Sequence, residues 1–160
     1  MKNIVSQNQQ FLTFWLNTEL YAFAVTHVIE VLSEQGITFV PLSPEFVNGI
    51  INFRGGIVGV VETRKKLIMN DRDLSLGYNL IVMDITVGHE NVRLGALVDK
   101  VSDVIEVAED QIMPLPQNGF KYNPQFLIGT YNSNIGFVNL LNANVLFMAD
   151  SYISAIGGLI

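Results

Sequence analysis

Apolar residues in the middle of the chain fall into two short runs on either side of a tight turn. Ile50 and Ile51 precede the turn Arg54-Gly55-Gly56, and the apolar residues 57–61 follow it. Isoleucine and valine suit a pleated strand, and adjacent glycines reach positive φ angles at little steric cost. This pattern predicts a β-hairpin inside the core, with Arg54 as the one charge at its tip.

The N-terminal part of the chain shows a second hairpin pattern. Residues 11–16 are an apolar run that contains Trp15, residues 17–19 are a polar turn, and residues 20–25 alternate apolar and small side chains. This arrangement predicts two strands joined by a short turn. Residues 25–32 have apolar side chains at helical spacing and also a stretch that fits a strand, so either structure is open there.

Two short helical segments are expected around the central hairpin. Residues 43–49 offer Ser43 as a cap, Pro44 at the first helical position and Gly49 as a stop, which predicts a short helix. Residues 63–67 are expected to form one further helical turn. Residues 70–79 are polar with one glycine and predict a surface loop.

The second half of the chain carries two more hairpin patterns. Strands are predicted at residues 80–87 and 92–98 around a turn at 88–91, and at 126–131 and 135–141 around a turn at 132–134. The segments outside these hairpins are a proline-containing loop at 113–123, a short helix at 142–148 and an apolar tail at 153–160 that packs or frays.

The two halves of the chain resemble each other. Residues 28–31, Val-Ile-Glu-Val, recur at 104–107, and residues 46–50 are echoed by 126–130. The repeat predicts a mostly β protein with two units of about five strands each. Because neither unit buries much alone, they are expected to share an apolar seam within a single domain over residues 1–160. The expected lobes are 11–78 and 79–150, with the first strand and the C-terminal tail left unassigned.

Composition narrows the functional classes. The chain has 160 residues, 49% hydrophobic, no cysteine and a net charge of -6. The negative charge argues against nucleic-acid binding, which needs basic residues to neutralise phosphates; the one basic cluster, residues 64–66, is expected to be a solvated helix face. No apolar run approaches the roughly 18 residues of a membrane span. With a polar N-terminus that lacks a secretory signal, these features favour a cytoplasmic protein.

Catalytic and metal-binding patterns are not evident in the sequence. The two histidines, His27 and His89, lie far apart and have no cysteine beside them, which argues against a zinc site. Gly55-Gly56 precedes a strand rather than a helix, so it does not predict a phosphate loop. The candidate acids Glu30, Glu62, Asp99 and Glu106 are scattered. We therefore expect no enzyme activity and no cofactor or metal.

Arg54 has two possible roles on this reading. It can pair with Glu30 and hold two elements together, which contributes about 0–1 kcal/mol at a surface. It can also bind a carboxylate of a partner, because a guanidinium makes bidentate contacts. Val28 and Val104 are either core residues or the walls of an exposed apolar groove that would suit a partner helix.

Several of these segments resemble one family. Residues 51–55, Ile-Asn-Phe-Arg-Gly, and residues 57–64, Ile-Val-Gly-Val-Val-Glu-Thr-Arg, resemble the Asn-Leu-Arg-Gly and Ile-Val-Pro-Ile-Val-Asp-Leu-Arg signature of CheW-like domains. Residues 44–49 are similar to the helix that precedes this signature, and residues 98–104 to the family's second signature. The resemblance covers residues 11–150, with motifs in both halves.

The resemblance implies a fold of two five-stranded SH3-like β-barrels packed around a shared apolar core. It implies a non-catalytic adaptor of bacterial chemotaxis signalling, cytoplasmic and associated with membrane receptor arrays without inserting into the membrane. Its partners would be the cytoplasmic tips of chemoreceptors and the CheW-like regulatory domain of the histidine kinase CheA. The positions that match receptor-binding residues are Val28, Glu30, Gly49, Arg54, Val101 and Val104. The candidates for kinase binding are Ile57, Val58, Gly59, Val60, Ile135 and Val138.

Three residues depart from the family pattern. Gly59 stands where proline is usual, Glu62 where aspartate is usual, and Phe53 where leucine is usual. A divergent accessory adaptor, or one from a pilus-type chemosensory system that binds receptors without the kinase, would also carry such changes. A CheV-type protein would add a receiver domain, for which 160 residues leave no room. A small-ligand binder or enzyme on the same barrels would need a concave polar pocket with perturbed carboxylates.

Overall fold

The computed structural model describes residues 7–41, 46–70, 73–115 and 122–148. The strands are β1 (Asn8–Leu16), β2 (Glu19–Ala24), β3 (Val28–Leu32), β4 (Val47–Phe53), β5 (Gly56–Glu62), β6 (Asn79–Val87), β7 (Glu90–Val98), β8 (Lys100–Ala108), β9 (Leu127–Ser133) and β10 (Gly136–Leu141). The helical segments are α1 (Thr63–Lys66), α2 (Ala143–Leu146) and the 3₁₀ turns Val25–His27, Leu74–Leu76, Glu109–Gln111 and Pro124–Phe126. None of the helices in these residues is long and apolar enough to cross a membrane.

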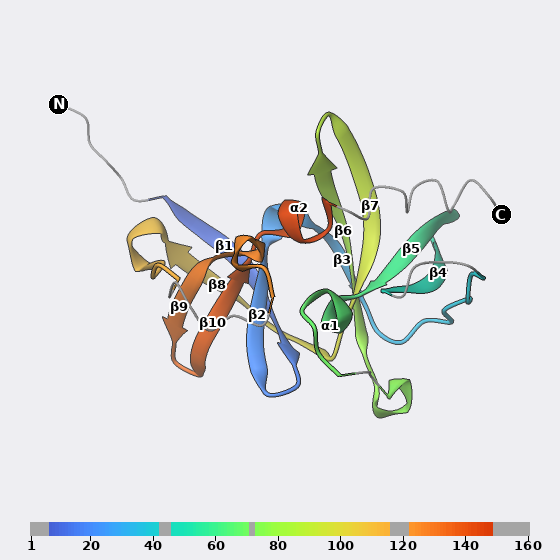
Figure 1. Ribbon diagram of the computed structural model, residues 1–160, viewed down its shortest axis with the longest axis horizontal. Coiled ribbons are helices and arrows are strands. Elements are labelled where there is room, and N and C mark those ends of the chain that lie inside the picture. Colours follow the sequence, from blue (N-terminus) through green and yellow to red (C-terminus); the bar gives the residue numbers. More distant parts are fainter. Residues whose placement is uncertain (1–6, 42–45, 71–72, 116–121, 149–160) are drawn as a thin grey trace.

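The ten strands form two five-stranded sheets that lie side by side (Figure 1). One sheet has the order β8-β1-β2-β10-β9 and takes strands from both ends of the chain, so we call it the split barrel. The other has the order β3-β6-β7-β5-β4 and uses one uninterrupted stretch, so we call it the continuous barrel. This architecture confirms the expected mostly β fold of two five-stranded SH3-like barrels with short helices.

The sheets do not follow the expected lobes of 11–78 and 79–150. β2 pairs in parallel with β10, and β1 pairs with β8, so the N-terminal hairpin completes the sheet of the C-terminal strands. In the same way β5 pairs in parallel with β7, which brings β6 and β7 into the sheet of β3 to β5. The unassigned first strand therefore belongs to the split barrel, and the tail at 153–160 lies outside the described residues.

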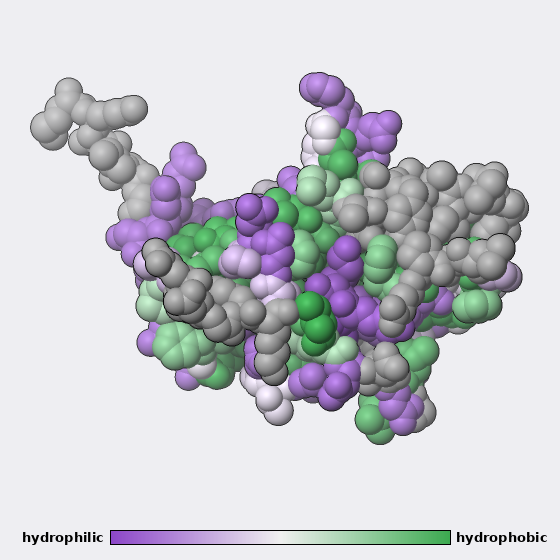
Figure 2. Space-filling view, viewed as in Figure 1, coloured by the Kyte–Doolittle hydropathy of each residue, from purple (hydrophilic) through white to green (hydrophobic). Residues whose placement is uncertain are grey.

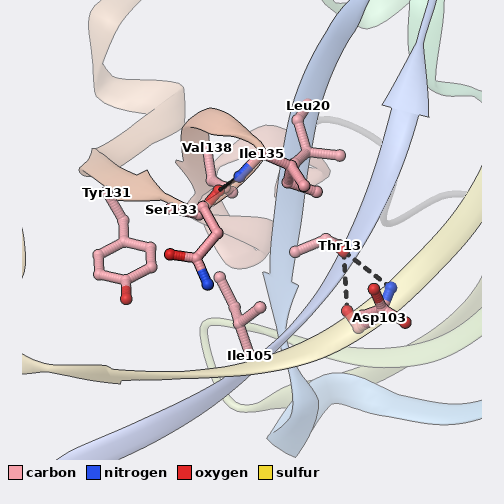
Figure 3. Close-up of a pocket in the computed structure, with 9 residues that line it drawn as sticks. Thr13, Leu20, Asp103, Ile105, Tyr131, Ser133, Ile135 and Val138 are labelled. Atoms are coloured by element: carbon pink, nitrogen blue, oxygen red, sulfur yellow. Dashed lines mark hydrogen bonds between the residues drawn. The ribbon is translucent and has the colours of Figure 1, made fainter.

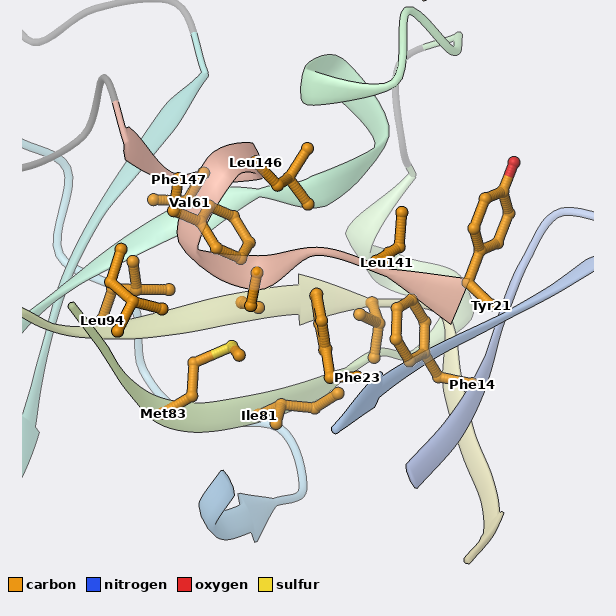
Figure 4. Packing of buried hydrophobic residues seen from close by; sticks show 14 of the residues in the cluster. Phe14, Tyr21, Phe23, Val61, Ile81, Met83, Leu94, Leu141, Leu146 and Phe147 are labelled. Carbon is orange, nitrogen blue, oxygen red and sulfur yellow. The ribbon is translucent and has the colours of Figure 1, made fainter. Parts of the chain in front are cut away.

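The inner strands are apolar on both faces because each face has its own core. Along β1, Phe11 and Trp15 pack inside the split barrel, while Phe14 faces the continuous barrel. Along β6, Leu80 packs inside the continuous barrel, while Ile81 faces the split one. The residues between the barrels form one shared core, and it includes Phe23 and the neighbouring Phe147, which directly follows α2 (Figure 4). The expected apolar seam is thus confirmed.

The internal repeat is confirmed in three dimensions. β9 and β10 repeat β4 and β5 with their first residues displaced by 80 positions, from Val47 to Leu127 and from Gly56 to Gly136. Each of these hairpins has its edge strand bridged by a residue of the preceding loop, Thr38 with Ile50 and Met113 with Thr130. The helix caps agree as well. The amides of Glu62 and Asn142 donate to the carbonyls of Phe46 and Phe126 at 2.7 Å in both cases.

Most predicted elements form, and the main difference is at residues 43–49. All four predicted hairpins are present, and residues 63–66 and 143–146 are helical. Residues 25–32 combine both alternatives, with a 3₁₀ turn Val25–His27 followed by β3. The predicted helix at 43–49 is wrong at its C-terminal end: Val47 and Gly49 belong to β4, while 43–45 lie outside the described residues. Pairing of Gly49 with Val60 on β5 outweighs the local stop signal.

The expected loops are only partly described. The segment at 70–79 contains the 3₁₀ turn Leu74–Leu76, and its last residue begins β6. In the expected loop at 113–123, Met113 bridges Thr130, and residues 116–121 lie outside the described part.

Candidate functional site

Arg54 and Glu30 form an exposed ion pair on the continuous barrel. Arg54 lies in the two-residue turn between β4 and β5, where φ is +51° for Arg54 and +80° for Gly55. Its Nη2 is 2.5 Å from Glu30 Oε1, and its guanidinium carbon is 4.8 Å from the ring centroid of Phe53. The side chains are 63% and 39% exposed, so both remain accessible to a partner. The turn therefore places positive φ on Arg54 and Gly55, rather than on Gly55 and Gly56.

The pair joins the two edges of its sheet. β3 and β4 are the outermost strands of the continuous barrel, and Glu30 belongs to β3 while Arg54 follows β4. We call the line along which two edge strands of one barrel face each other its edge seam. In the continuous barrel this seam is spanned by an ion pair. Of the two roles considered for Arg54, the pairing with Glu30 is present, and the exposure of both groups leaves the partner role compatible with it.

The other residues matched to receptor binding occupy three environments. Val28 and Val101 are half-buried and pack against the shared core from opposite barrels, which places them on the two sides of the join. Val104 is 53% exposed on β8. Gly49 is buried in β4 at φ +148°, and a Cβ there would lie 2.1 Å from the carbonyl oxygen of Thr38. Gly49 therefore serves the backbone, because no side chain fits at its position.

The residues matched to kinase binding divide into exposed and buried sets. Ile57 and Ile135 are exposed, and each lies at or beside a hairpin turn. The remaining four are buried inside the barrels and have no accessible side chain: Val58, Gly59, Val60 and Val138. Gly59 pairs with Ile50 on one side and Leu94 on the other, so it sits within the sheet. Only Ile57 and Ile135 of this set can touch a partner directly.

Sequence reasoning missed the exposed apolar residues around Ile135. Phe137, on β10, is 62% exposed and extends the apolar surface that Ile135 begins. Figure 2 shows hydrophobic surface at the lower left, over the end of the split barrel where β9 and β10 meet. A signal was present in the sequence. Val138 and Leu140 face the barrel interior, so a strand's two-residue period puts Phe137 on the outer face.

The basic cluster at residues 64–66 is not the solvated face that was expected. Arg64 donates from Nε to Asp99 Oδ1 at 2.8 Å and from Nη2 to Asp99 Oδ2 at 2.5 Å, and only 14% of its side chain is exposed. Lys66 Nζ lies 4.4 Å from the ring centroid of Phe46. The expectation failed because the partner, Asp99, is 35 residues away in sequence and is brought close only by the tertiary fold.

Asp99 connects the two barrels. It is the single residue between β7 and β8, where the chain leaves the continuous barrel and enters the split one. Besides Arg64, its carboxylate accepts the backbone amide of Asn17 at 2.7 Å, from the turn between β1 and β2. Its own amide donates to the carbonyl of Trp15 at 3.2 Å. One carboxylate thus holds α1 of one barrel and a turn of the other.

The candidate acids and histidines do not converge on a common site. Glu30 and Asp99 pair with arginines, Glu62 accepts the amide of Arg64 as the cap of α1, and Glu106 is exposed on β8. His27 Nδ1 lies 3.2 Å from the carbonyl of Asp84, and His89 is exposed in the turn between β6 and β7. Within the described ranges, no group of three His, Asp or Glu side chains could hold a metal ion.

Among the described residues, Tyr21 is the ionisable group whose pKa departs most from its usual value. It belongs to β2 and points into the shared core, where it stacks on Phe14, and its hydroxyl donates to Glu19 Oε2 at 3.0 Å. Burial, together with the neighbouring Tyr122 and Glu19, raises the pKa of Tyr21 well above its usual range. The same burial raises the pKa of Tyr122. These groups stay neutral and are structural.

The chain matches one protein family over most of its length. The family model of the CheW-like domain matches residues 10–150. The chemotaxis protein CheW of Klebsiella aerogenes is 31% identical over 121 residues, which cover 76% of this chain and 70% of that protein. The chemotaxis protein CheW of Bacillus subtilis is 25% identical over 152 residues, or 95% of each chain.

A solved structure supports the same relationship. The scaffolding protein TtCheW from Thermoanaerobacter tengcongensis aligns with a TM-score of 0.76 and 29% identity. The alignment covers 88% of this chain and 93% of that one. The likeness therefore includes both barrels and not one of them alone.

Proposed function

The chain belongs to the CheW-like domain family and is a chemotaxis adaptor, and we propose that it links chemoreceptor cytoplasmic tips to the histidine kinase CheA. In this proposal the protein catalyses no reaction, binds no cofactor and works in the cytoplasm at membrane receptor arrays. The observation that carries the proposal is the family match over residues 10–150, together with two separate accessible surfaces on two joined barrels.

The receptor-binding surface is proposed at the edge seam of the continuous barrel and the adjoining join between barrels. Glu30 and Arg54 offer one group of each charge at a site open to solvent. An arginine that already has one carboxylate partner keeps further N–H donors for a partner's oxygen atoms. Val28 and Val101 add apolar contact from the two barrels, which suits one face of an amphipathic receptor helix. Val104 extends this apolar wall on β8.

The kinase-binding surface is proposed at the hairpin ends marked by Ile57 and Ile135. Both side chains are exposed, at 41% and 59%, and they belong to the equivalent hairpins of the two barrels. The buried residues Val58, Val60 and Val138 support these hairpins from inside. We assign the direct contact to the two isoleucines, because an exposed apolar side chain is removed from water when a partner covers it.

Calorimetry with three purified proteins tests the proposal. This chain is titrated with the regulatory domain of CheA and with a receptor-tip fragment from the same organism. We expect it to bind both. The informative variant is Arg54→Asn, since asparagine tolerates the positive φ of +51° and the turn is retained. Loss of an arginine hot spot is expected to weaken receptor binding by about tenfold and to leave kinase binding unchanged.

Arg93→Asn is the matched control for this experiment. Arg93 is an exposed arginine of the same barrel that pairs with Asp84 at 2.9 Å, and its side chain is 48% exposed. Receptor binding that falls equally in both variants would contradict the assignment to Arg54. Binding of the receptor fragment without any binding of the kinase domain would contradict the linking role and support an accessory adaptor instead.

A further inference from the structure

The two barrels differ at their edge seams. In the continuous barrel Arg54 and Glu30 span the seam, while the equivalent tip in the split barrel carries Asn134 and Ile135. No ion pair joins the edge strands β8 and β9 within the described residues. A hollow of about 240 Å³ lies there instead, between Asp103 and Ile105 of β8 and Tyr131 and Ser133 of β9. The seam of the split barrel therefore carries a hollow where the seam of its counterpart is bridged by an ion pair.

The hollow is lined by both apolar and polar residues, and one of the polar residues is a carboxylate without a partner in the described part of the chain. Figure 3 shows Leu20, Ile105, Ile135 and Val138 around a common space, with the ring of Tyr131 at one side. The backbone of Asp103 is fixed, because the Thr13 hydroxyl donates to its carbonyl at 2.8 Å and accepts its amide at 3.0 Å. Among the described residues its side-chain oxygens have no hydrogen-bond partner.

A second hollow lies on the other side of the same hairpin tip. It measures about 290 Å³ and shares Leu20 and Ile135 with the first. Its remaining wall includes Trp15, Phe137 and Glu19, and the Glu19 carboxylate also accepts the hydroxyl of Tyr21. Across both hollows the charged lining residues are Asp103 and Glu19, and both are acidic.

We propose that the tip of the β9–β10 hairpin and its two hollows bind a short apolar segment of a partner protein that is flanked by lysine or arginine. Trp15, Tyr131 and Phe137 are aromatic, and aromatic side chains dominate the energetics of protein interfaces. The apolar centre requires apolar side chains in the partner, and the two acidic rims require cations at the ends of the segment. Ile135 stands between the hollows and contacts the segment at its middle.

The inference rests on the proposed adaptor function only for the assignment of Ile135 to a partner-binding surface. It goes beyond that function because it gives the chemistry of the docked segment at Ile135. The overall charge of -6 acts in the same direction, since it favours the approach of a basic segment over an acidic one. The rim carboxylates then select between segments of equal hydrophobicity.

The test uses two short peptides with the same leucine and phenylalanine centre, one flanked by lysines and the other by glutamates. Trp15 is the single tryptophan of the chain and lines the second hollow, so its fluorescence reports binding directly. At low ionic strength we expect the lysine peptide to bind at least about tenfold more tightly than the glutamate peptide, with the difference shrinking as salt is added.

Variants distinguish binding at this site from nonspecific hydrophobic binding elsewhere on the surface. Ile135→Ser is expected to weaken binding of the lysine peptide by roughly fivefold or more, as for loss of a central apolar contact. Asp103→Asn is expected to reduce the preference for lysine over glutamate without removing the binding. The control is Ile128→Ser, the same substitution at an exposed isoleucine on β9, away from the hairpin tip. It is expected to leave binding of the lysine peptide unchanged.

Three results would overturn the inference: no binding of the lysine peptide, equal binding of both peptides, or equal loss in Ile128→Ser and Ile135→Ser. The CheA regulatory domain is titrated into the same samples. Binding of that domain without the peptide preference overturns the inference and leaves the proposed function intact. Failure of that domain to bind overturns the proposed link to the kinase and leaves the peptide result to judge the inference.

Discussion

The two edge seams show how one fold carries two different surfaces. At the seam of the continuous barrel, Arg54 and Glu30 bring opposite charges together at a solvent-exposed site. At the seam of the split barrel, the corresponding hairpin tip is uncharged and a hollow of about 240 Å³ lies between the edge strands. The strand order and the bridges at Ile50 and Thr130 are the same in both. The residues of the turns therefore determine the chemistry of each surface, while the common pattern of strand pairing gives both barrels the same fold.

The two hairpin turns have different backbone conformations. Arg54 and Gly55 both take positive φ, and Asn52 Oδ1 accepts the amide of Gly55. In the split barrel the positive φ moves to Gly136, and the hydroxyl of Ser133 accepts the amide of Ile135 at 3.2 Å. A turn of the second kind leaves its central residues with ordinary φ angles, so a β-branched isoleucine fits at the tip without strain.

The most severe test of the equivalence between barrels replaces the matched glycines Gly49 and Gly129 with alanine. A Cβ at Gly49 would lie 2.1 Å from a backbone oxygen at a φ of +148°, whereas one at Gly129 would lie 2.5 Å from the Cγ2 methyl group of Ile112 and 2.7 Å from the Met113 carbonyl oxygen. Gly49→Ala is expected to lower the free energy of unfolding by about 3 kcal/mol or more, and Gly129→Ala by about 1–3 kcal/mol. Urea unfolding measures both, and a larger loss for Gly129→Ala would contradict the comparison.

A second test compares the ion pair between the barrels with the ion pair at the seam. Asp99→Asn removes the charge that a largely buried Arg64 needs, so it is expected to cost about 2–3 kcal/mol. Glu30→Gln acts on an exposed pair and is expected to cost about 0–1 kcal/mol. Thermal unfolding of both variants under the same conditions provides the measurement. Equal losses would mean that exposure does not separate the two pairs.

A third test compares the ends of the two helices. After α1, Ile68 takes φ +55°, the amide of Met69 donates to the carbonyl of Arg64, and the amide of Ile68 donates to the carbonyl of Lys65. This pattern favours glycine at the position of Ile68. Ile68→Gly is expected to raise the free energy of unfolding by about 1 kcal/mol. Met148→Gly, 80 positions further on, gains nothing because Met148 has no positive φ. Chemical denaturation that shows no gain for Ile68→Gly would contradict the assignment of strain.

The smallest expected effect concerns Tyr21, which faces the shared core where the continuous barrel has Leu94. The raised pKa means that folded Tyr21 keeps its proton at a pH where the unfolded tyrosine, with a pKa of about 10, loses it. Its contribution to stability is therefore complete below about pH 10 and declines as the pH rises above that value. Tyr21→Phe should flatten the loss of stability between neutral and strongly alkaline pH in urea titrations. An unchanged slope would exclude Tyr21 as the source.

Local pattern was sufficient to predict the hairpins, and tertiary pairing was needed for the rest. Alternating apolar residues located the strands of the four hairpins, because burial of one or both faces of a strand produces a recognisable sequence pattern. They did not identify β8, and they left residues 25–32 open between a helix and a strand. The division into lobes failed because no local signal shows that β2 pairs with β10. The helix expected at 43–49 failed at Gly49 for the same reason, since a glycine that ends a helix and a glycine pressed against Thr38 look alike in sequence.

The candidate site was predictable to the extent that a family motif marked its residues. Arg54 and Glu30 were matched by motif and meet in the structure, and Ile57 and Ile135 are exposed. Val58, Gly59, Val60 and Val138 were matched in the same way and are buried, because a motif also contains the residues that support a surface. Phe137 and the bond between Arg64 and Asp99 fell outside the matched positions. The exposure of Phe137 follows from strand periodicity. The bond between Arg64 and Asp99 depends on the tertiary fold, because Asp99 lies where the chain passes from one barrel to the other.

The parallel pairing of β2 with β10 has a consequence for synthesis on the ribosome. Translation from Ala24 to Gly136 takes roughly 6–22 s at typical rates, so the first hairpin emerges long before its neighbour in the sheet. The continuous barrel needs nothing beyond Val98 and can form while the chain is still growing. Chains stalled shortly after that residue has left the exit tunnel should therefore resist protease in β3 to β7 while β1 and β2 remain cleavable. Folding of the split barrel would then be completed when β9 and β10 emerge and β10 pairs with β2.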